Sequence, residues 1–331
     1  MARTAKAGTK PKSPRAAKVG RPATKPVTKK TVDTSTTSRV IKADAKTEAT
    51  ASTGGSTSKV VNSTSVNRPL VSRFASVSPQ ALVAEAVGTF GLTLAALTAP
   101  TDQPLLVGLS LAVLLVGMIS ISGGHFNPAV TFGLWAIHKL ETVKIPFFWL
   151  SQFIGALAAF MVVGAYNGTG SSLDMSNFAN WDWRIFWVEA IGTAVFLFGL
   201  VATLKNLSSN PARAAGIGLS LAAGLVIAGG LLTANATREQ TAVQGGSAKS
   251  VSQTFGAQNA ALNPAVALAQ TERDVQAINS SISGGGESAG DSQRKPSHFT
   301  LPTILGTLLG AAVGANLYLL LTGLSWRSKQ L

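Results

Sequence analysis

The sequence predicts an all-α integral membrane protein with six transmembrane helices and two re-entrant half-helices, arranged as an inverted repeat. Three observations lead to this prediction. Charged residues make up only 13% of the 331 residues, whereas a soluble domain contains about 25%. The apolar residues gather in six blocks of 19 to 24 residues, and the two halves of the apolar region share a series of short motifs. The blocks therefore indicate membrane spans and not one soluble core.

Residues 1–78 are predicted to form a disordered, basic tail. Residues 1–75 carry 16 of the 28 Lys and Arg residues but only three of the 14 acidic residues. Their Ala-, Thr-, Ser- and Pro-rich composition cannot bury enough apolar surface to offset the entropy of ordering. We favour a solvated segment that contacts anionic lipid. We do not expect a nucleic-acid partner, although the Gly-Arg-Pro at 20–22 resembles the core of a minor-groove hook.

Six apolar blocks follow the tail, and each is long enough to cross about 30 Å of hydrocarbon as a helix. Only Glu85 and Glu189 are charged within them. The blocks cover residues 81–99, 104–122, 146–166, 185–204, 214–234 and 301–324.

The charges between the blocks predict the orientation in the cell membrane. Lys and Arg occur in the second and fourth connections and after the sixth block, whereas Asp residues occur in the first and third, with Arg184 as the exception. By the positive-inside rule, both termini are expected in the cytoplasm. Two polar inserts, 235–259 and 271–298, would then be external, and their Gly, Ser and Gln content suggests flexible surface loops.

The six blocks form two copies of one three-span unit. A Glu-Ala-(Val/Ile)-Gly-Thr motif begins at Glu85 and again at Glu189, and Gly-Leu-Ser-Leu-Ala begins at Gly108 and again at Gly218. Because three is an odd number, the second copy enters the membrane from the opposite side. Inverted repeats of this kind place the functional site near the bilayer midplane. The two predicted copies are residues 79–166 and 182–324.

Each copy also contains Asn-Pro-Ala between its second and third span. Asn is a good helix N-cap, and Pro is favoured at the first helical position. The apolar runs that follow, 129–137 and 265–269, are too short to cross a membrane. We therefore expect two half-helices whose N-termini meet near the midplane. The predicted pore residues are Asn127, Pro128, Ala129, Asn263, Pro264 and Ala265.

The sequence Ser-Gly-Gly-His-Phe-Asn-Pro-Ala-Val at 122–130 resembles the signature of the aquaporin and glycerol-facilitator family, the major intrinsic proteins. The Glu-x-x-Gly-Thr elements are also similar, and the resemblance covers residues 79–324 apart from the inserts. It implies a homotetramer in the lipid bilayer, with a pore in each subunit for water, a polyol or a dissolved gas. In aquaporin-type pores, facing helix N-termini with about half a positive charge each repel cations.

The resemblance implies that Glu85 and Glu189 each hold a half-helix loop through backbone N–H groups, a role we favour over proton relay. His125, beside the first Asn, either lines the pore or packs within its loop. The chain has no cysteine, and no acid pair or activated serine suggests catalysis. We therefore expect no enzymatic activity, no cofactor and no metal.

A third Asn-Pro-Ala begins at Asn210, and Arg213 follows it, as in the usual second motif of the family. This motif precedes a full apolar span and lies only 21 residues after the glutamate of its repeat, whereas the first motif lies 42 residues after its own glutamate. We therefore take Asn263 as the true counterpart and expect 210–213 to form a cytoplasmic loop.

The chain departs from the family pattern at the outer filter, where members usually carry an Arg after the second Asn-Pro-Ala. Val266 stands at that position, and the resemblance assigns the other filter positions to Val107, Leu225 and Ala260, which are also apolar. Two functions stay open. One is a passive channel for water or small neutral solutes such as glycerol. The other is a non-conducting scaffold or adhesion protein, because hydrophobic constrictions can close by dewetting.

Overall fold

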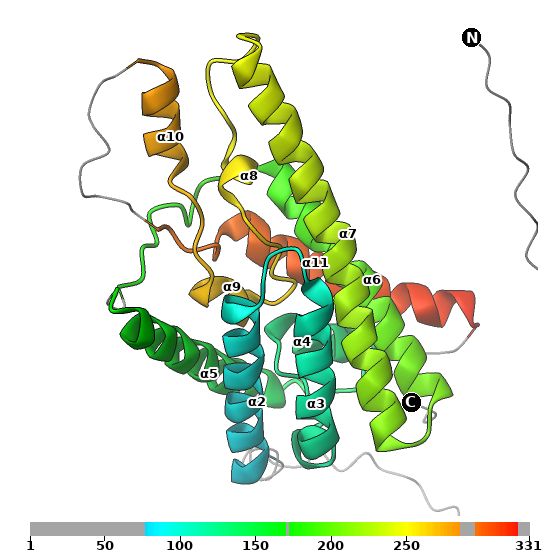
Figure 1. Ribbon diagram of the computed structural model, residues 1–331. Coiled ribbons are helices and arrows are strands. Elements are labelled where there is room, and N and C mark those ends of the chain that lie inside the picture. Colours follow the sequence, from blue (N-terminus) through cyan, green and yellow to red (C-terminus); the bar gives the residue numbers. More distant parts are fainter. Residues whose placement is uncertain (1–76, 170–171, 285–294, 324–331) are drawn as a thin grey trace, which may run out of the picture. The chain divides into compact units, whose positions relative to one another are not determined.

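The computed structural model describes residues 77–169, 172–284 and 295–323, which form ten helices (Figure 1). Six of these, α2, α3, α5, α6, α7 and α11, are long and apolar enough to cross a membrane, which confirms the predicted fold class. The tail predicted for residues 1–78 lies outside the described residues apart from its last two. The bounds are α2 Pro79–Thr98, α3 Pro104–Ser122, α4 Pro128–Ala136, α5 Lys144–Asn167, α6 Trp183–Asn206, α7 Asn210–Gln244, α8 Gln253–Gly256, α9 Pro264–Ala269, α10 Val275–Ile282 and α11 Leu301–Leu321.

Local sequence determines where these helices begin. The Ser78 side chain caps α2 by accepting a hydrogen bond from the Ala81 backbone N–H at 3.1 Å, and Thr300 caps α11 in the same way. A proline stands in the first turn of α2, α3, α4, α7, α9 and α11, where its missing N–H has no intrahelical partner to lose. The half-helices α4 and α9 are short helices that begin at the proline of the two predicted Asn-Pro-Ala motifs.

Equivalent contacts in the two halves show the internal repeat. Helix α2 packs against α5 as α6 packs against α11, and α3 packs against α7. At the crossing of α3 and α7, a Cβ on Gly108 would collide with the carbonyl oxygen of Gly218, and a Cβ on Gly218 would collide with that of Gly108. In each case the missing side chain lets the two helix backbones come into direct contact. Figure 1 shows α2, α3 and α7 side by side.

One predicted loop is helical. Helix α7 begins at Asn210, so the third Asn-Pro-Ala forms the first turn of a span, and the expectation of a loop at 210–213 was wrong. The short connection from α6 to α7 is closed by Arg213, which donates from Nε to the Leu207 carbonyl at 2.7 Å and from Nη2 to the Leu204 carbonyl at 3.1 Å. The arginine therefore satisfies carbonyl groups at the end of α6.

The inserts predicted as flexible loops, 235–259 and 271–298, contain helices in their described parts. Helix α7 continues without a break to Gln244, so that it extends beyond the connection between α2 and α3 (Figure 1). Helices α8 and α10 lie within the two inserts. Composition suggested loops because these segments are polar. Composition does not show which polar side chains bond to one another in the fold.

Glu239 organises the first insert. Its carboxylate forms an ion pair with Arg184 at 2.9 Å, accepts from the Asn235 side chain at 2.9 Å, and accepts from the backbone N–H and hydroxyl of Ser252 at 2.8 and 2.7 Å. These contacts join the start of α6, the extended part of α7 and the segment before α8.

Asn279 on α10 joins the second insert to the first. It accepts from the Val251 backbone N–H at 2.7 Å and donates to the Val251 carbonyl at 3.0 Å. The Thr254 hydroxyl and backbone N–H both donate to Asp182, at 2.7 and 3.0 Å, and Asp182 also caps α6. The two inserts are therefore tied to each other and to the end of a span.

Candidate pore site

The two half-helices are capped by the asparagines of the predicted motifs. Asn127 Oδ1 accepts from the backbone N–H of Ala129 at 2.7 Å, and Asn263 Oδ1 accepts from that of Ala265 at 3.0 Å. Both asparagines are buried. Pro128 and Pro264 occupy the first turn in each case.

The same asparagines hold the two half-helices to each other. Asn127 Nδ2 donates to the carbonyl of Leu262 at 2.8 Å, and Asn263 Nδ2 donates to the carbonyl of Phe126 at 3.0 Å. Phe126 and Leu262 have φ angles of 50° and 51°, a region that bulky residues rarely adopt. An amide nitrogen carries two hydrogens, so each asparagine retains a second N–H for a molecule at the junction.

A buried carboxylate supports the loop before α4. Glu85 Oε1 accepts from the His125 backbone N–H at 3.0 Å and the Ser122 hydroxyl at 2.6 Å. Its Oε2 accepts from the Phe126 backbone N–H and from Gln152 Nε2, both at 2.8 Å. One carboxylate thus satisfies two consecutive backbone N–H groups of a strained loop.

Glu189 makes the equivalent contacts in the second copy. It accepts from the backbone N–H groups of Ala261 and Leu262, both at 2.8 Å. The further partner differs from that of Glu85: it is His298, whose Nε2 lies 2.9 Å from Glu189 Oε1 and whose Nδ1 lies 2.5 Å from Glu272 Oε1. Burial alone would lower the pKa of His298, but the hydrogen bonds and charges of the two carboxylates outweigh it and raise this pKa to about 10.

Sequence reasoning missed His298 and Glu272. Both lie in the second insert, which was interpreted as a surface loop, yet they are only 2% and 3% exposed. The available signal in the sequence was the position of His298 just before the last apolar block. A single histidine has no periodicity or spacing that predicts a buried ion pair.

His125 has two kinds of contact. Its Nδ1 lies 3.0 Å from the Thr131 hydroxyl, and its ring packs edge-on against Phe148 at 5.1 Å between centroids. It also lines the cavity that begins at the junction of the half-helices. The two alternatives left open for His125 are therefore compatible in this geometry.

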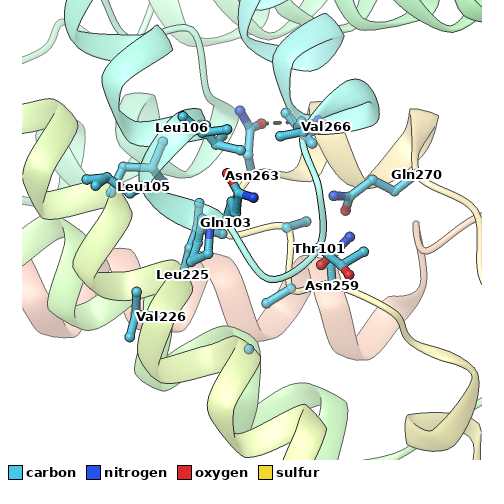
Figure 2. Close-up of a pocket in the computed structure, with 18 of the residues that line it drawn as sticks. Thr101, Gln103, Leu105, Leu106, Leu225, Val226, Asn259, Asn263, Val266 and Gln270 are labelled. Carbon is cyan, nitrogen blue, oxygen red and sulfur yellow. Dashed lines mark hydrogen bonds between the residues drawn. The ribbon is translucent and has the colours of Figure 1, made fainter.

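A cavity of about 610 Å³ leads from the asparagine pair to the connection between α2 and α3. The structure places all four predicted filter residues in its lining: Val107, Leu225, Ala260 and Val266. Figure 2 shows Leu225, Leu105 and Leu106 on one side and Asn259 and Gln270 on another. The cavity therefore has an apolar side and a polar side that is rich in amides and hydroxyls, and its lining also includes Asp102 and His125.

The chain is similar in sequence to a family of known proteins. The family model for major intrinsic proteins matches residues 75–239. Aquaporin Z of Photorhabdus laumondii is 40% identical over 75 residues, which cover 22% of this chain and 32% of that protein. Aquaporin TIP1-2 of Musa acuminata is 28% identical over 130 residues, 39% of this chain and 50% of that protein.

The match to these curated relatives thus spans about a third to a half of their length. Among solved structures, the aquaglyceroporin from Plasmodium falciparum aligns with a TM-score of 0.44 and 18% identity, over 72% of this chain and 94% of that one. The match to the family model, the aquaporin relatives and the six apolar helices lead to one conclusion: the chain belongs to the major intrinsic protein family.

Proposed function

We propose that this protein is a passive transmembrane channel for water and small neutral solutes such as glycerol. The observation that carries the proposal is the junction of α4 and α9, where Asn127 and Asn263 cap two facing half-helices at the inner end of a cavity. Each helix N-terminus carries about half a positive charge, so the junction disfavours cations while the free amide N–H groups can bind a neutral molecule.

The outer part of the cavity supports a solute larger than water. Val266 is short and apolar where the family usually carries an arginine, so no lysine or arginine among the described residues lines the cavity beside Leu225. A polyol has both C–H and O–H surface, and it fits a cavity with one apolar and one polar wall. Water alone would gain little from the apolar wall.

The other parts of the proposal are a homotetramer in the cell membrane with both termini in the cytoplasm. The protein surface supports contact with lipid or with a second subunit. Helix α3 has little buried surface within one chain, and Val113 and Val116 on it are 74% and 57% exposed. Apolar side chains in such numbers require lipid or a neighbouring subunit as cover.

Permeability of reconstituted liposomes tests the channel directly. Stopped-flow measurements with water and with glycerol should show that wild type passes both. Val266→Arg should lower glycerol passage more than water passage, because the long side chain narrows the outer cavity; an added barrier of about 1.4 kcal/mol lowers a rate tenfold. Val243→Arg, at a half-buried position of α7 that does not line the cavity, is the matched control.

The outcomes separate the alternatives. Wild-type liposomes that pass neither water nor glycerol would overturn the channel and favour the non-conducting scaffold. If wild type conducts and Val266→Arg behaves like Val243→Arg, the channel stands but position 266 does not form its filter.

A further inference from the structure

Val266 stands where the family usually has an arginine, so this part of the cavity lacks the polar side chain of that arginine. We propose that the side-chain amide of Gln270 takes over this task and selects small neutral solutes that carry hydroxyl or amide groups. The proposal rests on the channel function and identifies a specificity-determining residue that the sequence did not indicate.

Gln270 lies on the same face as Val266, one helical turn further along the chain. Its backbone N–H donates to the Val266 carbonyl at 3.0 Å and so ends α9. Residues four apart on a helix are neighbours on one face. Both side chains accordingly line the same cavity, and Figure 2 shows the Gln270 side chain pointing from the end of α9 toward the cavity, with its amide at the tip.

The Gln270 amide has no partner within the part of the chain that the structure describes. The residue is only 8% exposed, and its Oε1 is buried without a hydrogen bond. Buried polar side-chain atoms in folded proteins nearly always have a partner. An unpaired amide beside a cavity therefore indicates a place where a guest molecule donates or accepts the missing hydrogen bond.

Hydrogen bonds within the protein fix the backbone around Gln270. The Gln270 carbonyl accepts from the His298 backbone N–H at 3.0 Å, and the Glu272 backbone N–H donates to the Pro296 carbonyl at 2.8 Å. The His298 side chain is held between Glu272 and Glu189. A side chain mounted on such a fixed segment can discriminate between solutes, because its position does not adapt to each one.

The surroundings of Gln270 define the solute class. It also lines a smaller cavity of about 170 Å³ next to the first, together with Thr101, Gln258 and Asn259. These three supply neutral amides and a hydroxyl, which bind hydroxyl and amide groups, and the same cavity is also lined by the ion pair of Glu272 and His298. A polyol that fills the cavity loses its water partners and needs this contact. A water molecule that passes in single file keeps hydrogen bonds to the waters before and behind it, so it depends less on this contact.

Gln270→Met tests this role, because methionine is close to glutamine in length but has no amide. In liposomes, the ratio of glycerol to water permeability should fall roughly three- to tenfold, the range that one hydrogen bond provides. Gln276→Met, the same change at an exposed position of α10, should leave the ratio unchanged. Gln270→Asn keeps an amide and should stay closer to wild type than Gln270→Met.

The ratio does not depend on how much protein is reconstituted, so a loss of folded protein alone would not move it. Gln270→Leu, also without an amide, provides the measurement if Gln270→Met does not fold. A wild-type ratio in either amide-free variant overturns the role of Gln270 while leaving the channel intact. Wild-type liposomes that pass neither solute overturn the channel itself, and the proposal with it.

Discussion

Replacing Glu189 with glutamine removes one of the acceptor oxygens that hold the second half-helix. The Glu189 carboxylate accepts the backbone N–H groups of Ala261 and Leu262, each at 2.8 Å. Glutamine has the same shape, but one oxygen becomes an NH₂ donor, so one of these N–H groups then faces another donor. An unpaired buried N–H costs about 1–3 kcal/mol of stability.

Glu189→Gln also removes one of the two carboxylates that contact His298. Breaking a buried ion pair costs about 3–5 kcal/mol when the remaining charge is left alone. Because Glu272 still contacts His298, we expect the lower part of that range. With the unpaired N–H included, the free energy of unfolding should fall by about 4 kcal/mol near neutral pH.

Glu85→Gln is the matched comparison. Glu85 also accepts two backbone N–H groups, but its side-chain partners are the uncharged Ser122 and Gln152. The hydroxyl of Ser122 can rotate to accept from the new NH₂ group. We therefore expect a loss of about 2 kcal/mol, which is the cost of an unpaired N–H alone.

The difference between the two variants in lost free energy of unfolding should depend on pH. The pKa of His298 rises from 6.5 to about 10 in the folded protein. A raised histidine pKa stabilises the fold fully below the unfolded value, and this stabilisation is lost as the pH rises through the folded value. The excess destabilisation of Glu189→Gln over Glu85→Gln should therefore be largest near pH 6 and should shrink as the pH approaches 10.

Denaturant unfolding in detergent, followed by fluorescence of the six tryptophans, gives the required free energies at pH 6, 8 and 10. The wild type provides the reference at each pH. Equal losses for Glu189→Gln and Glu85→Gln at all three pH values would refute the stabilising role of the charged His298.

Three further substitutions test the helix crossing and the topology. Gly218→Ala should lower the free energy of unfolding by about 1–3 kcal/mol because the new methyl group collides with Gly108. Gly117→Ala, where a Cβ meets open space, should instead raise it by up to about 1 kcal/mol in thermal unfolding. Ser247→Cys gives the natively cysteine-free chain one exposed thiol. An impermeant maleimide should label it from outside intact cells, and labelling only after lysis would contradict the external insert.

The sequence predicted the spans and the half-helices because both depend on local properties. Apolar length alone identifies a span, and Asn-Pro followed by a short apolar run identifies a half-helix. The error at 210–213 has a local cause too. This Asn-Pro-Ala differs in position from the one at Asn263, yet Pro211 is equally favourable in a first helical turn. Helix α7 therefore begins four residues before the predicted apolar block.

The ordered inserts and the buried ion pair could not be predicted in this way. His298 contacts Glu272 and Glu189, which lie 26 and 109 residues away in sequence. Gln270 can be identified as a candidate specificity residue only from the cavity that it lines. Such residues carry no period or spacing of their own, so they are identified only when the fold brings distant segments together.

The two halves of the repeat share their backbone contacts but not their supports. Glu85 is completed by Ser122 and Gln152, which lie at the end of α3 and within α5, whereas Glu189 is completed by His298 from the second insert. The second insert therefore supports α9 and the Gln270 that follows it, whereas the loop before α4 is supported by side chains of α3 and α5. Because Leu262 donates to Glu189 and accepts from Asn127 Nδ2, the second insert is linked to the paired asparagines through the second copy.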